Sequence, residues 1–305
     1  MKAVVFAYHN VGVRGLRTLL AAGMEVALVV THPDDPQENR WFDRVADVAA
    51  EFDLPVAYVD QAVDAALAQR VSALAPDYVF SFYFRRMLPA EVLAAARIAA
   101  LNMHGSLLPK YRGRVPVNWA VLHGERETGA TLHVMEAKPD AGDIVAQQAV
   151  PILPDDTAKE VFDKVTVAAE IALAGVLPQL LQGRVPRRRN DLAAGSYFGG
   201  RKPEDGRIDW AQPAQAVYNL IRAVAPPYPG AFFDHAGRRY IVARARLARP
   251  AQAALLPADA PLGPHRAGPL LLARCGDGGA VALHELWDAS HPGVPLPPAD
   301  WPVHP

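Results

Sequence analysis

The chain has 305 residues, of which 51% are apolar and 21% charged, a composition typical of a globular protein with one large or two medium domains. Its 31 basic and 32 acidic residues give a net charge of −1, which does not favour nucleic acid as a partner. The single cysteine, Cys275, excludes a framework of intrachain disulfides and fits a reducing compartment. Residues 1–7 lack the longer apolar region of a signal peptide, and no apolar run reaches about 18 residues, so we expect a cytoplasmic protein without membrane insertion.

The first part of the chain alternates short apolar runs with segments in which apolar residues recur at helical spacing. The runs predict strands at residues 2–7, 25–31, 56–59, 78–84 and 98–102. The segments between them predict helices at residues 12–22, 39–52, 63–74 and 89–96. This alternation favours an α/β domain with a doubly wound, Rossmann-like parallel sheet.

Further along, the pattern predicts a helix at residues 115–123, strands at 128–135 and 143–149, and a long helix at 157–182. After a basic run at Arg187–Arg189, the periodicity is lost in a glycine-rich segment. Beyond it we expect a helix at 213–224 and short strands at 231–233, 239–245 and 280–286. The chain is therefore expected to have a first domain over residues 1–189, a linker over 190–203 and a smaller, mostly β, barrel-like domain over 204–305.

Asn102 and His104 follow directly on the apolar run at residues 98–101. If this run is a strand, a side-chain period of two places both groups on one face at its carboxyl end. Open α/β sheets bind their substrates at that end. An amide beside an imidazole suits the stabilisation of an oxyanion together with proton transfer.

Spacing alone fits equally well a histidine that is satisfied at a strand end and an asparagine in a turn. Two further features favour a functional site. Residues 105–114 form a long loop with two glycines and three basic residues, and such loops at strand ends often hold a ligand. Asp140 lies in a turn-rich segment between two predicted strands, and an aspartate beside His104 is expected to raise the pKa of the imidazole.

Two other motifs carry weaker indications. Gly12 and Gly15 stand where a dinucleotide fingerprint would lie, but no third glycine follows at the required spacing, so we expect a tight turn and no NAD. Residues 32–35, His-Pro-Asp-Asp, resemble a zinc-ligand motif. Because the motif follows the second predicted strand and not the first, we expect a loop near the substrate and no metal.

The loop from Asn102 to Gly113, together with the segment from Lys138 to Ile144, resembles the 10-formyltetrahydrofolate-dependent formyltransferases, which share an Asn-x-His pair and a distant aspartate. Residues 206–210 are similar to the stretch that opens the C-terminal barrel-like domain of the longer members. The likeness covers most of the chain and fades beyond about Phe233. It implies a formyl-transfer enzyme whose first domain, residues 1–189, is catalytic.

Within this family the chain is most similar to the formyltransferase domain of the bifunctional polymyxin-resistance protein, which formylates UDP-4-amino-4-deoxy-L-arabinose on the path to modified lipid A. The matching stretches are residues 1–8, 32–42, 80–83 and 116–119. The bifunctional protein continues into an NAD-dependent decarboxylating domain that these 305 residues do not contain. We therefore expect the formyl-transfer half alone.

The resemblance implies that Asn102, His104 and Asp140 are the catalytic residues. Asn102 and protonated His104 would donate to the oxyanion, and Asp140 would keep His104 charged and oriented. It also implies a folate pocket, lined largely by backbone groups, at Arg86, Met87, Leu88, Arg114, Glu136, Ala137, Lys138, Pro139 and Asp140. The implied cosubstrate is 10-formyltetrahydrofolate, the implied acceptor is a nucleotide-linked amino sugar, and no metal is needed. No oligomeric state is indicated.

Methionyl-tRNA formyltransferase is the main alternative, with Arg187–Arg189 and the second domain contacting the acceptor stem. Asp34, Asp35 and Glu38 stand where the tRNA enzyme usually carries a basic insertion, and an acidic loop is a poor partner for RNA phosphates. A nucleic-acid partner is therefore not expected. A hydrolase that releases formate, a zinc deacetylase and a non-catalytic binding module stay open as further alternatives.

Overall fold

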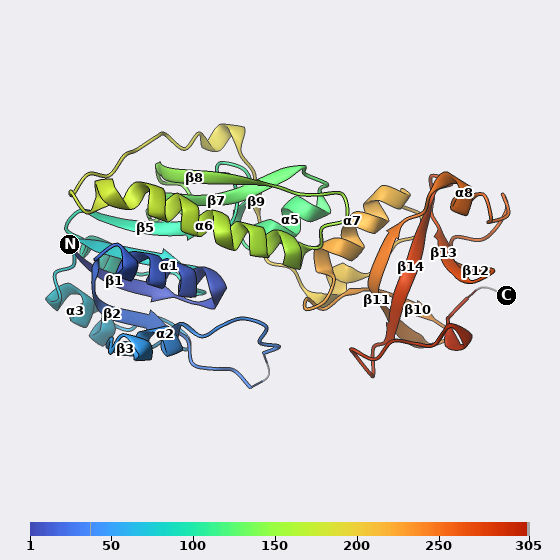
Figure 1. Cartoon of the computed structure of the whole chain (residues 1–305), viewed down its shortest axis with the longest axis horizontal. Coiled ribbons are helices and arrows are strands. Elements are labelled where there is room, and N and C mark those ends of the chain that lie inside the picture. Colours follow the sequence, from blue (N-terminus) through green and yellow to red (C-terminus); the bar gives the residue numbers. More distant parts are fainter. Residues whose placement is uncertain (37, 304–305) are drawn as a thin grey trace. The chain divides into compact units, whose positions relative to one another are not determined.

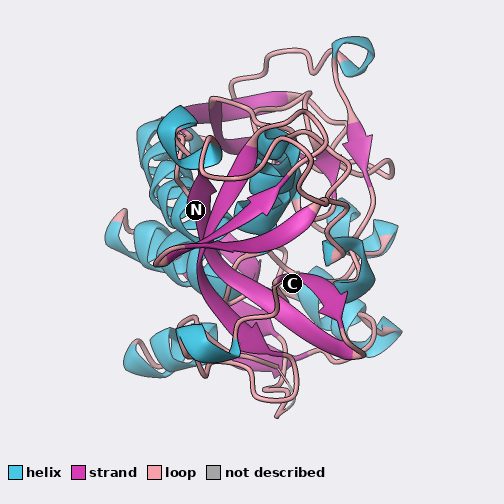
Figure 2. Cartoon of the chain, turned by 90° about the vertical axis from the view of Figure 1, so that its right-hand side faces the viewer, coloured by secondary structure: helices cyan, strands magenta, loops and turns pink. Residues whose placement is uncertain are grey.

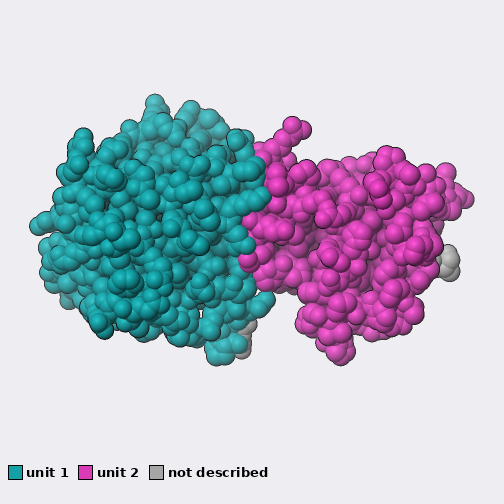
Figure 3. Space-filling view, viewed as in Figure 1, with its two compact units in different colours: residues 1–116, 127–151, 162–199 teal, residues 117–126, 152–161, 200–305 magenta. Residues whose placement is uncertain are grey.

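The computed structural model describes residues 1–36 and 38–303, and the chain divides into two compact units (Figures 1 and 3). Unit 1 comprises residues 1–116, 127–151 and 162–199, and unit 2 comprises residues 117–126, 152–161 and 200–305. Unit 2 thus includes two short segments from within the predicted first domain. The first ten residues of the predicted linker, 190–199, belong to unit 1.

Unit 1 is built on a seven-stranded sheet with the order β3-β2-β1-β4-β5-β7-β8. The five strands at the first end of this order are parallel, whereas β7 is antiparallel to β5 and β8 is antiparallel to β7. The strands are β1 Lys2–Ala7, β2 Glu25–Thr31, β3 Val56–Tyr58, β4 Tyr78–Phe82, β5 Ala99–His104, β7 Glu127–Val134 and β8 Ile144–Pro151. The predicted doubly wound, mainly parallel fold is confirmed, with an antiparallel pair added at one end.

Helices cover both faces of this sheet, as expected for parallel strands joined by crossovers. The helices of unit 1 are α1 His9–Ala21, α2 Val45–Glu51, α3 Ala65–Ala73, α4 Ala90–Ala94 and most of α6 Ala158–Leu180, whereas α5 Pro116–Leu122 belongs to unit 2 from residue 117 on. On one face, Val71 of α3 and Val92 of α4 share a buried cluster with Val79 of β4. On the other face, the Tyr78 hydroxyl of β4 donates to the Leu180 carbonyl at the end of α6 (2.8 Å).

Unit 2 carries an antiparallel sheet with the order β10-β11-β14-β13-β12, covered by helix α7, Ala214–Val224. Val217 and Ile221 of α7 are buried with Val242 and Leu283 of the sheet. The strands are β10 Ala231–His235, β11 Arg238–Leu247, β12 Gly263–Ala267, β13 Leu270–Arg274 and β14 Ala280–Asp288. They are strongly twisted ribbons (Figure 2), and the predicted smaller, mostly β domain is confirmed.

Several elements differ from the prediction. The helix predicted at 39–52 is formed only over α2, because Trp41 and Phe42 instead pack on the His9 ring, with centroids 4.6 and 3.9 Å away. Two short parallel strands, β6 Arg112–Gly113 and β9 Tyr197–Phe198, were not predicted. Strands β12 and β13, a short helix α8 at Pro250–Ala253, and single 3₁₀ turns at Leu192–Ala194, Pro203–Gly206 and Pro298–Asp300 were also missed.

No helix in the described part of the chain is both long enough and apolar enough to span a membrane.

Helix α1 approaches the sheet closely at Gly15. A Cβ atom at Gly15 would lie 2.6 and 2.8 Å from two ring carbons of Phe82, which is fully buried. Gly15→Ala should therefore destabilise the protein by about 1–3 kcal/mol, measured by urea unfolding. Gly175→Ala, at an exposed position of helix α6 where an added Cβ would meet no atom within 4 Å, is the control and should stabilise by about 0.5–1 kcal/mol. Equal effects of the two substitutions would contradict this packing.

Candidate active site

Strand β5 presents Asn102 and His104 on the same face, two residues apart, as predicted from their spacing. The predicted strand ended at residue 102, whereas β5 continues through His104. The antiparallel pairing with β7 sets Asn102 opposite His133 and His104 opposite Thr131. The Asn102 side-chain nitrogen lies 3.0 Å from His133 Nε2 across this pair.

Asp140 lies in the turn between β7 and β8, and the structure brings its side chain to His104. Its Oδ1 atom is 3.5 Å from His104 Nδ1 and 3.4 Å from His133 Nε2. Its Oδ2 atom accepts a hydrogen bond from the Gly113 amide at 2.9 Å. Asn102, His104, His133 and Asp140 thus form one cluster, largely buried, at the carboxyl end of β5.

The hydrogen bonds define which nitrogen of His104 can exchange a proton. His104 Nε2 lies 2.8 Å from the Tyr111 carbonyl, which can only accept, so Nε2 carries a hydrogen. Nδ1, which faces Asp140, is then the nitrogen that gains or loses a proton. In the same way, His133 Nδ1 donates to the Val134 carbonyl at 2.8 Å, which leaves its Nε2 facing Asn102 and Asp140.

Burial decides the direction in which the His104 pKa is shifted. The sequence predicted that Asp140 would raise this pKa, whereas the net shift is downward. Removal from water disfavours the charged imidazolium and lowers the pKa of His104 below 6.5, although Asp140 and the Tyr111 carbonyl act in the opposite direction. Burial acts on Asp140 in the opposite direction and raises its pKa, but His104, His133 and the Gly113 amide outweigh burial and lower that pKa to about 2. At neutral pH the cluster therefore holds an ionised carboxylate beside a mainly neutral His104.

The long loop at residues 105–114 is fixed by polar contacts to β7 and β8. Thr131 Oγ1 donates to the Ser106 carbonyl at 2.6 Å and accepts from the Leu108 amide at 3.2 Å. Gln147 Nε2 donates to the Leu108 carbonyl at 3.0 Å. These bonds hold the loop so that the Tyr111 carbonyl and the Gly113 amide reach His104 and Asp140.

The residues predicted to line a folate pocket lie mostly on the surface of unit 1, where a ligand can reach them. The exposed members of this set are Arg86, Met87, Arg114, Glu136, Ala137, Lys138 and Pro139. Arg86 donates from Nε to the Asp60 carbonyl at 2.9 Å, and Leu88 packs partly against the core beside Val92. Asp140 alone of the predicted set belongs to the buried cluster.

Sequence reasoning missed His133, Asn190 and the two backbone partners at Tyr111 and Gly113. His133 is a buried polar residue inside a predicted strand, which was the available signal. Its place opposite Asn102 depends on the strand register, which the spacing does not contain. Asn190 donates from Nδ2 to the carbonyls of Asp140 and Gly142 at 3.0 and 3.2 Å, and no sequence pattern marks it.

The zinc interpretation of residues 32–35 finds no support. His32 donates from Nδ1 to the Val59 carbonyl at 2.6 Å and accepts at Nε2 from the Arg85 amide at 3.1 Å, so both ring nitrogens are engaged. Asp34 pairs with Arg40 and Arg44 at 3.1 and 2.9 Å. Among residues 1–36 and 38–303, no group of three or more His, Cys, Asp or Glu side chains could hold a metal ion.

The same loop is less acidic than its sequence indicates, since its carboxylates are paired. Glu38 forms an ion pair with Arg85 and accepts from the Tyr8 hydroxyl at 2.7 Å. Burial and this bond to Glu38 raise the pKa of Tyr8 to about 12. The charge argument against RNA is therefore weaker than the sequence alone indicated.

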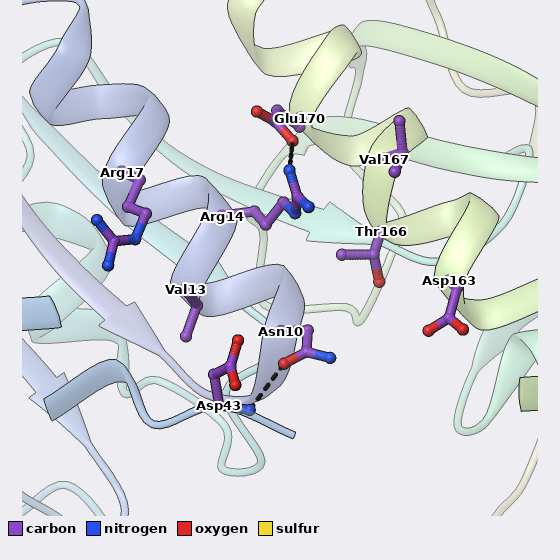
Figure 4. Close-up of a pocket in the computed structure, with 9 residues that line it drawn as sticks. All are labelled: Asn10, Val13, Arg14, Arg17, Asp43, Asp163, Thr166, Val167 and Glu170. Atoms are coloured by element: carbon purple, nitrogen blue, oxygen red, sulfur yellow. Dashed lines mark hydrogen bonds and ion pairs between the residues drawn. The ribbon is translucent and has the colours of Figure 1, made fainter. Parts of the chain in front are cut away.

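A separate surface pocket of about 460 Å³ lies between α1 and α6 (Figure 4). Of its charged side chains, Arg14 pairs with Glu170 at 2.7 Å, and Arg17 pairs with Glu51 outside the pocket lining at 2.7 Å. Asn10 at the start of α1 accepts from the Asp43 amide at 2.8 Å. None of the residues of the His104 cluster lines this pocket.

Comparison with known structures gives proteins of the same fold. An N-formyltransferase from Helicobacter canadensis, in complex with folinic acid and dTDP-3-aminofucose, is 19% identical, with 93% of this chain and 99% of that chain covered and a TM-score of 0.70. A 4-N formyltransferase from Francisella tularensis is 20% identical, with coverages of 81% and 98% and a TM-score of 0.63. HypX from Aquifex aeolicus, in complex with tetrahydrofolic acid, is 20% identical, with coverages of 98% and 46% and a TM-score of 0.63.

Family comparison is more specific. Residues 2–177 match the family described as "Formyl transferase", and residues 201–291 match "Formyl transferase, C-terminal domain". Since the first match alone covers more than half of the chain, the chain belongs to the formyl transferase family, the enzyme class predicted from its sequence.

Proposed function

We propose that the protein transfers the formyl group of 10-formyltetrahydrofolate to the amine of a nucleotide-linked amino sugar. The observation that carries this proposal is the cluster of Asn102, His104 and Asp140 at the carboxyl end of β5, in a chain of the formyl transferase family. The Helicobacter canadensis structure, with folinic acid and an amino-sugar nucleotide bound, supports the choice of donor and acceptor class. UDP-4-amino-4-deoxy-L-arabinose is the first candidate acceptor. With this acceptor, the enzyme would act in the modification of lipid A that gives polymyxin resistance.

In the proposed mechanism, 10-formyltetrahydrofolate supplies the formyl group, and the protein stabilises the tetrahedral intermediate formed by attack of the sugar amine. Asn102 donates from its amide to the developing oxyanion, and His133 orients that amide from the facing strand. His104 accepts at Nδ1 the proton released by the amine and returns it to N10 of the folate, while the new C–N bond forms and the old one breaks. Asp140 stabilises the imidazolium in between.

The assignment of His104 as the proton acceptor in its neutral form follows from its burial. A ring with a pKa below its ordinary value is mostly uncharged at neutral pH, and Nδ1 then presents a lone pair. The oxyanion contact falls to Asn102. All residues given a chemical role lie in unit 1, and we propose that the chemistry is confined to that unit.

We propose that the folate binds to the residues predicted from the sequence to line its pocket. Arg86, Met87 and Leu88, which follow β4, contact it from one side, and Glu136–Asp140 with Arg114 contact it from the other. Met87 is 65% exposed, so its apolar side chain is available for contact with a flat ring system.

Methionyl-tRNA formylation is the second candidate, favoured by the exposed run Arg187–Arg189 and by the paired carboxylates of the 32–38 loop. Binding of initiator tRNA that weakens steeply with salt would support it.

Removing any of the three catalytic side chains should slow formyl transfer. Asn102→Ala removes an oxyanion donor and should lower the single-turnover rate by about 10²–10³-fold. His104→Ala and Asp140→Ala should cost at least as much, because they remove the proton carrier and its counter-charge. Glu91→Ala, an exposed carboxylate on α4, is the control and should keep the wild-type rate. Wild-type rates in all three folded variants would show that the site is elsewhere.

The pH dependence should follow His104. Because burial lowers its pKa below 6.5 and the neutral ring is the active form, kcat/KM should stay level around neutrality and fall in acid as Nδ1 is protonated. Asp140→Asn removes the carboxylate that raises this pKa, so the residual activity should fall at a lower pH than in the wild type. The amine of the acceptor titrates equally in both enzymes, so the difference reports His104. A limb that moves to higher pH in the variant would exclude this protonation state.

The acceptor can be identified with a panel of UDP- and dTDP-linked amino sugars and 10-formyltetrahydrofolate, analysed by mass spectrometry. We expect a gain of one formyl group on an amino sugar nucleotide, with UDP-4-amino-4-deoxy-L-arabinose the best substrate. Formate release at the same rate without any amine would identify a hydrolase instead. Formylation of methionyl-tRNA alone would identify the second candidate.

A further inference from the structure

Residues 190–198 pack against the loop that carries the backbone partners of His104 and Asp140; we name this segment the strap. It lies within the range predicted as a linker, yet it belongs to unit 1 and contains strand β9. Unit 2 resumes at residue 200, and residue 199 alone separates it from the strap.

The strap holds Tyr111 from one side while His104 binds it from the other. Ser196 Oγ accepts from the Tyr111 amide at 2.9 Å, and the Tyr111 carbonyl accepts from His104 Nε2 at 2.8 Å. The Phe198 ring stacks on the Tyr111 ring, with centroids 5.3 Å apart. Tyr111 has φ +56°, a backbone conformation that a tyrosine adopts only where its surroundings impose it.

The strap also reaches Asp140, through two routes. Asn190, which is 6% exposed, donates to the Asp140 carbonyl at 3.0 Å, and Asp140 too has a positive φ, +52°. The pairing of β6 with β9 fixes the residue that binds the carboxylate: Gly113 donates to Asp140 Oδ2, and the next amide, Arg114, donates to the Phe198 carbonyl at 3.0 Å.

The approach of the strap to the loop is too close for a loosely packed connection. A Cβ atom at Gly113 would lie 2.1 Å from the Phe198 carbonyl oxygen, and one at Gly195 would lie 2.1 Å from the Pro109 carbonyl oxygen. Only glycine fits at both points.

We propose that the strap is a positioning element of the active site, in which Ser196 fixes the Tyr111 carbonyl that orients His104 and Asn190 fixes the backbone of Asp140. Neither side chain touches the reacting atoms. Ser196 holds the acceptor that keeps the hydrogen on His104 Nε2, and so keeps Nδ1 available for proton exchange. The expected effect on formyl transfer rests on the proposed function. The expected effect on the orientation of His104 does not depend on it.

The test uses the full chain with Ser196→Ala and Asn190→Ala, and it measures two quantities. The first is the titration midpoint of the His104 imidazole, followed by NMR and assigned with His104→Ala; it needs no substrate. The second is formyl transfer, separated into kcat and KM. The titratable groups that face the ring are Asp140 from the β7–β8 turn and His133 from β7, and both are retained in these variants.

We expect Ser196→Ala to lower the His104 midpoint, because the bond to the Tyr111 carbonyl favours the charged ring. The same variant should lower kcat about 10- to 100-fold by misplacing the ring, with KM changed less than about twofold. Asn190→Ala should lower kcat in the same way. Ser196→Thr keeps the hydroxyl and should restore both quantities. Ser72→Ala, on the exposed side of α3, is the matched control and should change neither.

Unchanged midpoints and unchanged kcat in folded Ser196→Ala and Asn190→Ala would overturn the proposal. A fall in kcat that Ser196→Thr does not restore would overturn the role of the Ser196 hydroxyl. If the wild type transfers no formyl group to any acceptor, the proposed function fails, and the NMR midpoint alone still decides the role of the strap.

Discussion

The buried carboxylate of Asp140 is the group on which the arrangement of the site depends. An ionised carboxylate removed from water is stable only where opposite charges and hydrogen-bond donors surround it. Here the Gly113 amide donates to it, His104 and His133 lie 3.5 and 3.4 Å from it, and interaction with these three groups lowers its pKa to about 2. Each partner comes from a different element, namely β5, β7 and the 105–114 loop. The need to satisfy one carboxylate therefore brings these elements to one point.

The departure of the sheet from an all-parallel order is what makes this possible. Because β7 runs antiparallel to β5, His133 lies directly opposite Asn102. The turn that leads from β7 to β8 then returns Asp140 to the carboxyl end of β5, beside His104. The added antiparallel pair thus supplies half of the buried polar cluster, while the five parallel strands position the other half.

What could be predicted from the sequence was what depends on neighbours along the chain. The period of two in a strand placed Asn102 and His104 on one face, and alternating patterns gave the fold. His133 was not predicted because its role depends on the register between strands. Tyr111 and Gly113 were not predicted because they act through backbone groups. The sign of the His104 pKa depends on depth of burial, which spacing does not contain. The first part of the helix predicted over 39–52, residues 39–44, is not helical because Trp41 and Phe42 pack on His9 instead.

We propose that His104 carries the proton in formyl transfer, while Asp140 and the Tyr111 carbonyl orient the ring and affect its charge. Chemical rescue tests this role of His104. Free imidazole added to the His104→Ala enzyme should raise its rate of formyl transfer in proportion to the neutral imidazole present, and should leave the wild type and Asn102→Ala unchanged. A His104→Ala enzyme that keeps the wild-type rate without imidazole, or whose reduced rate imidazole cannot raise, would show that His104 is not the proton carrier.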